Sequence, residues 1–132
     1  MNKVRKKVIR EKAIIAVYQY LLTQVNNDEI DAFLLNDNTF KNNEEELKLC
    51  KERINSTINH YDEYVNKIKP HLKKGWTIQR LSKMELAILL VAVDELQTEN
   101  KSVVINEAVE LTKKYCDDDS YKFINGILNN IG

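Results

Sequence analysis

Apolar residues recur every three or four positions along most of the chain, which is the spacing of one face of an α-helix. The first such stripe predicts a helix from about Lys3 to Gln24. A shorter apolar group predicts a second helix that ends before the polar run 36–38. The first stripe consists of Ala13, Ile14, Val17, Tyr18, Leu21 and Val25, and the second of Ile30, Phe33 and Leu34.

The clearest stripe lies in the middle of the chain and predicts a long helix. Either Pro70 ends this helix, or a bend near Asn59 and His60 divides it in two, and the pattern leaves both open. After the turn at residues 73–75, we expect Trp76 and Ile78 to fill the junction between the two halves of the core. The stripe consists of Leu47, Cys50, Ile54, Ile58, Tyr61, Val65 and Ile68.

The last part of the chain predicts three further helices. Ser82 and Glu85 have the spacing of a capping box, and it opens a helix from Met84 to Leu96 that is apolar on almost every side and therefore central. The next helix is expected over Val103–Tyr115. Three aspartates at 117–119 precede the last one, with residue 119 or 120 as its cap. With no convincing strand, we predict one all-α domain over residues 1–132.

Charge is distributed unevenly along the chain, although its formal net value is zero. Six basic residues against one acid give the first twelve residues +5, so the remainder carries −5. Such a basic start can orient a polyanion, or it can be a solvated terminus. Four of the cations follow steps of three and four and would share one side of the first helix, where they could follow a phosphate backbone. The basic residues are Lys3, Arg5, Lys6, Lys7, Arg10 and Lys12, and the four in step are Lys3, Lys6, Lys7 and Arg10.

Residues that carry out catalysis or bind metals are not arranged in any recognisable pattern. The two cysteines lie far apart, His60 and His71 are expected at the surface, and no glycine-rich loop follows a strand. The aspartates 117–119 could attract Mg²⁺, but helix capping explains them more simply. We therefore expect no enzyme activity, no metal and no cofactor.

The apolar run 13–22 behind the lysine-rich start superficially resembles a secretion signal. Polar positions at 18–20 interrupt that run and no cleavage pattern follows it, so we interpret it as a helix of a cytoplasmic protein. No segment approaches the roughly 20 apolar residues of a membrane span.

Base recognition in single-stranded RNA needs exposed aromatic or polar side chains beside the cations. Tyr121 and Phe123, with Lys122 between them, are the candidates near the end of the chain. Periodicity alone favours burial of Phe123, so both interpretations of that residue stay open.

Two C-terminal segments, 105–111 and 119–128, contain Asn106, Asn125 and Gly126 at positions that amphipathicity does not require. Together with Arg80–Glu85 and Val91–Leu96, they resemble the bacterial transcription antitermination factor NusB family. The resemblance implies about seven helices in two small bundles, approximately residues 1–72 and 76–132. It also implies a cytoplasmic, non-enzymatic adaptor that pairs with the ribosomal protein NusE. The pair would bind single-stranded boxA-type RNA, notably from ribosomal RNA operons, and join an antitermination complex on RNA polymerase.

Individual residues can be matched to the family's functional positions. The basic start matches its RNA-binding start, Asp119 and Phe123 match its RNA face, and Tyr18 and Glu85 match its NusE-facing surface. Each has a structural alternative: Tyr18 could be core, Asp119 a cap, and Glu85 the partner of a serine in the capping box. The chain departs from the family in having more Lys than Arg at its start, Cys116 where Gly is usual, and Tyr121 in place of a frequent His.

Two other functions remain open. A detached NusB-like domain of a ribosomal RNA methyltransferase system would need a downstream α/β domain, and the chain ends at Gly132 without one. A helical protein-interaction module, or one that lies on anionic lipid, would also use a basic amphipathic helix. The sequence leaves open whether the free protein is a monomer or a homodimer.

Overall fold

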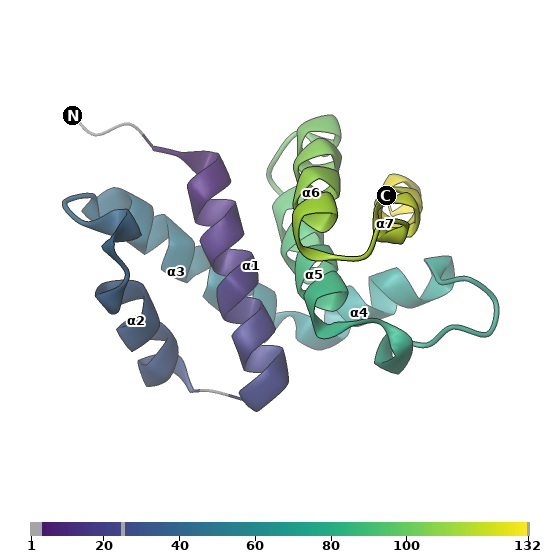
Figure 1. Cartoon of the computed structure of the whole chain (residues 1–132), viewed down its shortest axis with the longest axis horizontal. Helices are drawn as coiled ribbons and strands as arrows, with labels where there is room; N and C mark the ends of the chain where they lie inside the picture. Colours follow the sequence, from purple (N-terminus) through teal and green to yellow (C-terminus); the bar gives the residue numbers. More distant parts are fainter. Residues whose placement is uncertain (1–3, 25, 132) are drawn as a thin grey trace.

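Seven α-helices and three short 3₁₀ helices are found in the computed structural model, which describes residues 4–24 and 26–131 (Figure 1). No strand occurs among these residues, so the all-α prediction is confirmed. Lys3 and Val25 lie outside the described residues, and the first helix begins at Lys6. The α-helices are α1 (Lys6–Thr23), α2 (Asn27–Asn36), α3 (Glu44–Asn59), α4 (Tyr61–Ile68), α5 (Lys83–Leu96), α6 (Lys101–Tyr115) and α7 (Ser120–Asn130), and the 3₁₀ helices are η1 (Asn38–Phe40), η2 (Lys69–His71) and η3 (Ile78–Arg80).

Local capping residues explain most helix starts. Asn26, Asn43 and Asn100 each accept a hydrogen bond from a backbone N–H in the first turn of the following helix. The predicted capping box at Ser82 is present at the start of α5. The start of α7 differs from our expectation, because Asp119 precedes that helix without making a side-chain capping bond.

The bend predicted near His60 is the boundary between α3 and α4, so the middle stripe forms two helices. This bend also separates two hydrophobic clusters. The first joins α1, α2, η1 and α3, whereas the second joins α4, α5, α6 and α7. Helix α4 therefore packs with the C-terminal helices, which puts the division of the core near residue 60 rather than between residues 72 and 76.

Helix α1 contributes to both clusters, which fastens them together. Ile9 and Ala13 pack in the first cluster, and Ile14 and Val17 pack in the second. Helix α5 lies against α1, α3, α4, α6 and α7 and is the central helix that its composition predicts (Figure 1). Its residues 86–95 are all buried, including two acids.

The expectation that Trp76 fills the core is wrong. Ile78 is buried, but the Trp76 side chain is 46% exposed. Trp76 lies on the loop between η2 and η3 and is not among the residues that pack in the second cluster. This large exposed ring must therefore be explained by something other than core packing. Among the described residues, no helix is long and apolar enough to cross a membrane.

Candidate nucleic-acid interface

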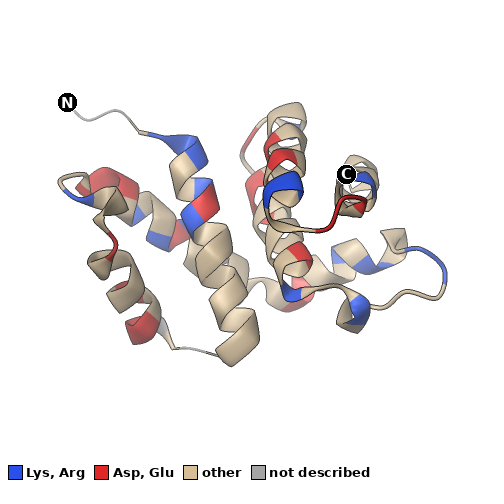
Figure 2. Ribbon diagram, in the orientation of Figure 1, with Lys and Arg blue, Asp and Glu red and all other residues tan. Residues whose placement is uncertain are grey.

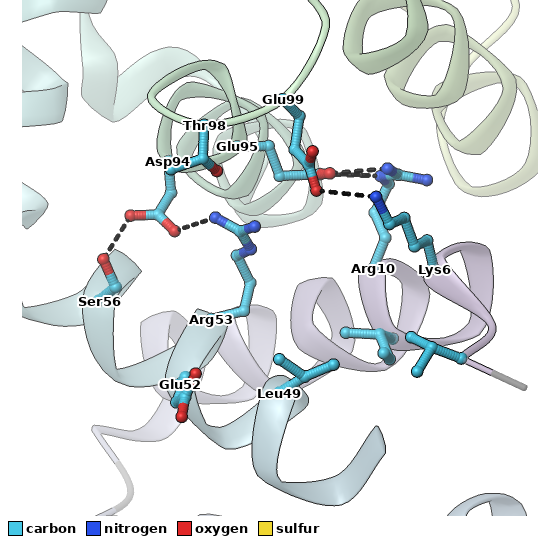
Figure 3. Close-up of a pocket in the computed structure, with 12 residues that line it drawn as sticks. Lys6, Arg10, Leu49, Glu52, Arg53, Ser56, Asp94, Glu95, Thr98 and Glu99 are labelled. Atoms are coloured by element: carbon cyan, nitrogen blue, oxygen red, sulfur yellow. Dashed lines mark hydrogen bonds and ion pairs between the residues drawn. The ribbon is translucent and has the colours of Figure 1, made fainter. Parts of the chain in front are cut away.

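The first turns of α1 lie beside acidic residues at the end of α5 and on α6. Arg10 donates hydrogen bonds to both carboxylate oxygens of Glu95, from Nε to Oε1 at 2.8 Å and to Oε2 at 2.9 Å, and from Nη2 to Oε2 at 2.7 Å (Figure 3). Both side chains are buried, with 6% and 5% exposure. Burial opposes the charge of Arg10, but its hydrogen bonds to Glu95 and the negative charges of Glu95, Glu107 and Glu99 together outweigh burial and leave the pKa of the guanidinium raised. This geometry makes Arg10 a structural residue with little surface for a ligand.

Arg5 is also engaged within the protein. Its Nη2 lies 2.6 Å from Oε1 of Glu46, and its backbone N–H donates to the same carboxylate at 2.6 Å. Glu46 is fully buried, and the bond from Arg5 holds the pKa of this carboxyl below its usual range. Arg5 thus fastens the start of the chain to α3, although about half of its side chain remains exposed.

Lys6 and Lys7 differ from the two arginines because their ammonium groups are open to solvent. Lys6 Nζ lies 3.5 Å from Glu99 and Lys7 Nζ lies 3.4 Å from Glu107, but the lysine side chains are 69% and 79% exposed. Such surface ion pairs are weak and are readily exchanged for other anions. Among the described cations of the basic start, these two lysines are the most exposed, ahead of Arg5 at 47%.

Two further lysines, which the sequence reasoning missed, continue the positive charge from α1 toward α7. Lys114 on α6 pairs with Glu11 of α1 at 2.7 Å, and the ammonium of Lys113 lies 4.8 Å from the ring centroid of Tyr121 on α7. Figure 2 shows Lys and Arg positions at the start of α1 and at the end of α6, between α1 and α7. The positions of these two lysines within α6 do not indicate an RNA-binding role, because only the packing of the helices places them beside α1 and α7.

The four C-terminal candidates lie at the start of α7. Asp119 and Lys122 form an exposed ion pair at 3.5 Å, and Tyr121 is partly exposed beneath the lysine from α6. Phe123 is partly buried: it packs against the second cluster and also lines a hollow of about 460 Å³. Its side chain is therefore neither fully buried nor fully exposed, and its contact with RNA stays a prediction.

Tyr18 and Glu85 lie near the same end of the antiparallel pair α1 and α5. Residues neighbouring them, Leu21 and Lys83, line one shared hollow, whereas Arg10 and Glu95 meet at the opposite end. Tyr18 is partly buried against the second cluster.

Glu85 holds two helix starts together. One carboxylate oxygen accepts the backbone N–H of Ser82 at 2.8 Å, and the other accepts the Ser120 hydroxyl at 2.6 Å. The first bond belongs to the capping box of α5, and the second fastens the start of α7 to α5. Both carboxylate oxygens of Glu85 thus make structural contacts, and the residue is partly exposed.

A buried acid that the sequence reasoning did not single out connects α5 to the bend between α3 and α4. Asp94 accepts hydrogen bonds from Arg53 at 2.5 Å, from Ser56 at 2.6 Å and from the hydroxyl of Tyr64 at 2.6 Å. Burial, and then this carboxylate, raise the pKa of the Tyr64 hydroxyl. Arg53, Ser56 and Asp94 also line a hollow of about 320 Å³ between α1, α3 and α5 (Figure 3). All buried side-chain polar atoms of this network have hydrogen-bond partners, so it fixes the packing of the two clusters.

Cys116 ends α6 with φ −124° and ψ 176°, which is extended backbone that any residue adopts. The corner therefore needs no glycine. Burial raises the pKa of the Cys116 thiol to about 11. No group of three or more His, Cys, Asp or Glu side chains in the described part of the chain is arranged to hold a metal ion.

Comparison with known proteins places these features in a family. The model of the NusB family matches residues 7–132. The transcription antitermination protein NusB of Ligilactobacillus salivarius is 37% identical over 108 residues, which cover 80% of each chain. That of Finegoldia magna is 36% identical over 126 residues, covering 92% of this chain and 89% of the relative.

Solved structures agree with this match. NusB from T. maritima is 25% identical, with a TM-score of 0.85 over 98% of this chain and 92% of its own. A chain from a crystal structure of the antitermination factors NusB and NusE in complex with dsRNA is 28% identical. Its TM-score is 0.83, and the match covers 96% of this chain and 94% of that one.

Proposed function

The chain belongs to the NusB family, and we propose that it is a non-enzymatic RNA-binding adaptor of bacterial transcription antitermination that acts in the cytoplasm. It would pair with the ribosomal protein NusE and bind boxA-type single-stranded RNA, notably in ribosomal RNA operons. The observation that carries this proposal is the similarity along almost the whole chain to a protein solved together with NusE and RNA.

The RNA would follow cations from the start of α1 to the start of α7. Lys6 and Lys7 are exposed at one end, Lys113 and Lys114 lie between the two helices, and Lys122 is exposed at the other end. Lysines provide charge without the bidentate geometry of arginine, so this track fixes the position of the RNA rather than its sequence.

Base contacts would come from the start of α7, where Asp119, Tyr121 and Phe123 lie next to Lys122. Phe123 is partly exposed, as a stacking residue must be, and its remaining surface is anchored in the second cluster. Of the predicted RNA-binding cations, Arg5 and Arg10 would instead hold α1 in place through their bonds to the buried acids Glu46 and Glu95.

NusE would dock at the other end of the α1 and α5 pair, where Tyr18 and Glu85 lie. A basic ribosomal protein would be attracted to the carboxylate of Glu85 and would lengthen the cationic track, since this chain has no net charge of its own. We therefore expect weak RNA binding by the chain alone and tighter binding once NusE is added.

RNA titrations test this proposal. Fluorescence anisotropy of a labelled single-stranded boxA-type RNA should report a lower Kd with NusE than without it, and a scrambled RNA of equal length should bind more weakly than boxA in the presence of NusE. Equal affinity with and without NusE, or no preference for boxA, would contradict the proposal that this chain and NusE bind boxA-type RNA together.

A single variant tests the partner surface. Glu85→Gln keeps one oxygen to accept the Ser82 N–H, and its amide NH₂ can donate to the Ser120 hydroxyl oxygen, which reverses that bond, while the charge is removed. We expect weaker NusE binding with nearly unchanged thermal unfolding, because only the attraction to a basic surface is lost. Glu110→Gln, on the exposed side of α6, is the matched control. If both variants bind NusE equally well, Glu85 has only its structural role.

A further inference from the structure

Gly126 lies inside helix α7, where the packing of the protein does not require a glycine. A Cβ placed on Gly126 would meet no atom within 4 Å, and the residue does not have a positive φ. Glycine inside a helix destabilises it relative to alanine. Folding gains nothing from this glycine, so its role must lie in the space that it leaves open. Gly126 lines the hollow that Phe123 also lines.

Trp76 forms another part of the same hollow and is held there by its loop. The backbone N–H of Trp76 donates to the carbonyl of Lys73 at 2.9 Å, which closes a turn, and Gly75 in that turn has φ +86°. The guanidinium of Arg80 lies 5.9 Å from the ring centroid of Trp76, a cation–π contact. The indole is therefore positioned while nearly half of it remains exposed.

The hollow combines an apolar lining with cations and polar groups. Trp76, Phe123 and Ile127 provide apolar surface. Lys73, Lys122 and Asp119 also line the hollow, and the Asp119 carboxylate lies 3.5 Å from the Lys122 ammonium. Its volume of about 460 Å³ lies within the range of small-ligand sites, which is about 300 to 1,000 Å³. A flat, largely apolar ring joined to an anionic group has the chemistry that suits this lining.

We propose that this hollow receives one unpaired base of single-stranded RNA, with Trp76 as a stacking residue and Gly126 as the residue that leaves room for the base. The inference rests on the RNA-binding function proposed above and adds a second aromatic residue, from a different part of the chain, to Phe123. Lys73 and Lys122 would attract the flanking phosphates, which favours RNA over an apolar side chain of a protein partner.

The fluorescence of Trp76 provides a direct test, because the chain contains a single tryptophan. Titration with single-stranded boxA-type RNA should quench this fluorescence as the base stacks on the indole. The same RNA annealed to its complement should quench it much less, since its bases are paired. Trp76→Phe serves as the fluorescence blank when NusE is present in the mixture.

A second variant tests the space beside Gly126. Gly126→Leu should leave the unfolding temperature equal or higher, because leucine favours helix, yet it should weaken RNA binding about 5- to 150-fold, the equivalent of one stacked base. Asn129→Leu adds the same side chain to an exposed position of α7 outside the hollow and should change neither property.

The outcomes separate this inference from the proposed function. No binding of boxA-type RNA by the wild-type protein with NusE would overturn the proposed function itself. Normal RNA binding with unquenched Trp76 fluorescence, and with Gly126→Leu as active as Asn129→Leu, would overturn the base site alone. Loss of NusE binding in Gly126→Leu, with RNA binding by the chain alone unchanged, would assign the hollow to a protein side chain and would also overturn it.

Discussion

Replacement of Arg10 by alanine is expected to destabilise the fold far more than it affects contacts to RNA. Arg10 and Glu95 are buried and joined by two short hydrogen bonds, and Glu107 lies 3.8 Å from the same guanidinium. Without the guanidinium, the carboxylate of Glu95 would remain buried with no cation beside it. Breaking a buried ion pair from one side typically costs about 3 to 5 kcal/mol.

That cost is large compared with the whole stability of a domain, which is about 5 to 15 kcal/mol. With an m-value of about 2 kcal/mol/M in urea, Arg10→Ala should lower the unfolding midpoint by roughly 1.5 to 2.5 M. Lys7→Ala is the matched control, because it removes an exposed ion pair on the same helix worth about 0 to 1 kcal/mol.

Urea unfolding followed by circular dichroism measures this effect, and a double variant identifies its cause. Arg10→Met combined with Glu95→Leu removes both charges and should recover much of the stability lost in Arg10→Ala, because no unpaired charge is left inside. A midpoint for Arg10→Ala close to wild type, together with clearly weaker RNA binding, would refute the reasoning and return Arg10 to the RNA surface.

Two further predictions concern the surface of the chain. Lys6→Ala combined with Lys7→Ala should weaken binding to all RNA sequences. The slope of log K against log salt should fall by about 1.4, because each single-strand phosphate contact contributes about 0.7. The control Lys48→Ala changes an exposed lysine on α3 and should leave the slope nearly unchanged. The bond from the Lys12 ammonium lowers the pKa of Asp37 from 3.8 to about 2, so the ionised carboxylate stabilises the fold above pH 3.8 and this stabilisation is lost as pH falls toward 2. The difference between the urea midpoints of wild type and Asp37→Asn should therefore shrink by about half from pH 5 to pH 3, and a constant difference would contradict this assignment.

Sequence alone determined the helices and much of their boundaries. Apolar spacing and capping residues act within one or two turns, so α5 with its capping box and α6 were predicted with their observed ends and with starts within one and two residues of the observed ones. The bend at His60 was one of two possibilities, because Pro70 offered an equally local reason for the helix to end. Asp119 was expected as a helix cap from its residue type, but its side chain makes no such bond.

The roles of individual charged and aromatic residues were decided only by the tertiary structure. Arg10 and Lys6 belong to the same helix and the same predicted basic surface, yet one is buried against Glu95 and the other is exposed. Likewise Trp76 was expected to fill the junction between the two halves of the core, and only the course of the loop leaves it outside. Burial depends on contacts between residues far apart in the chain; Arg10 and Glu95, for example, are separated by 85 positions. No local pattern in the sequence indicates which partner each side chain will meet.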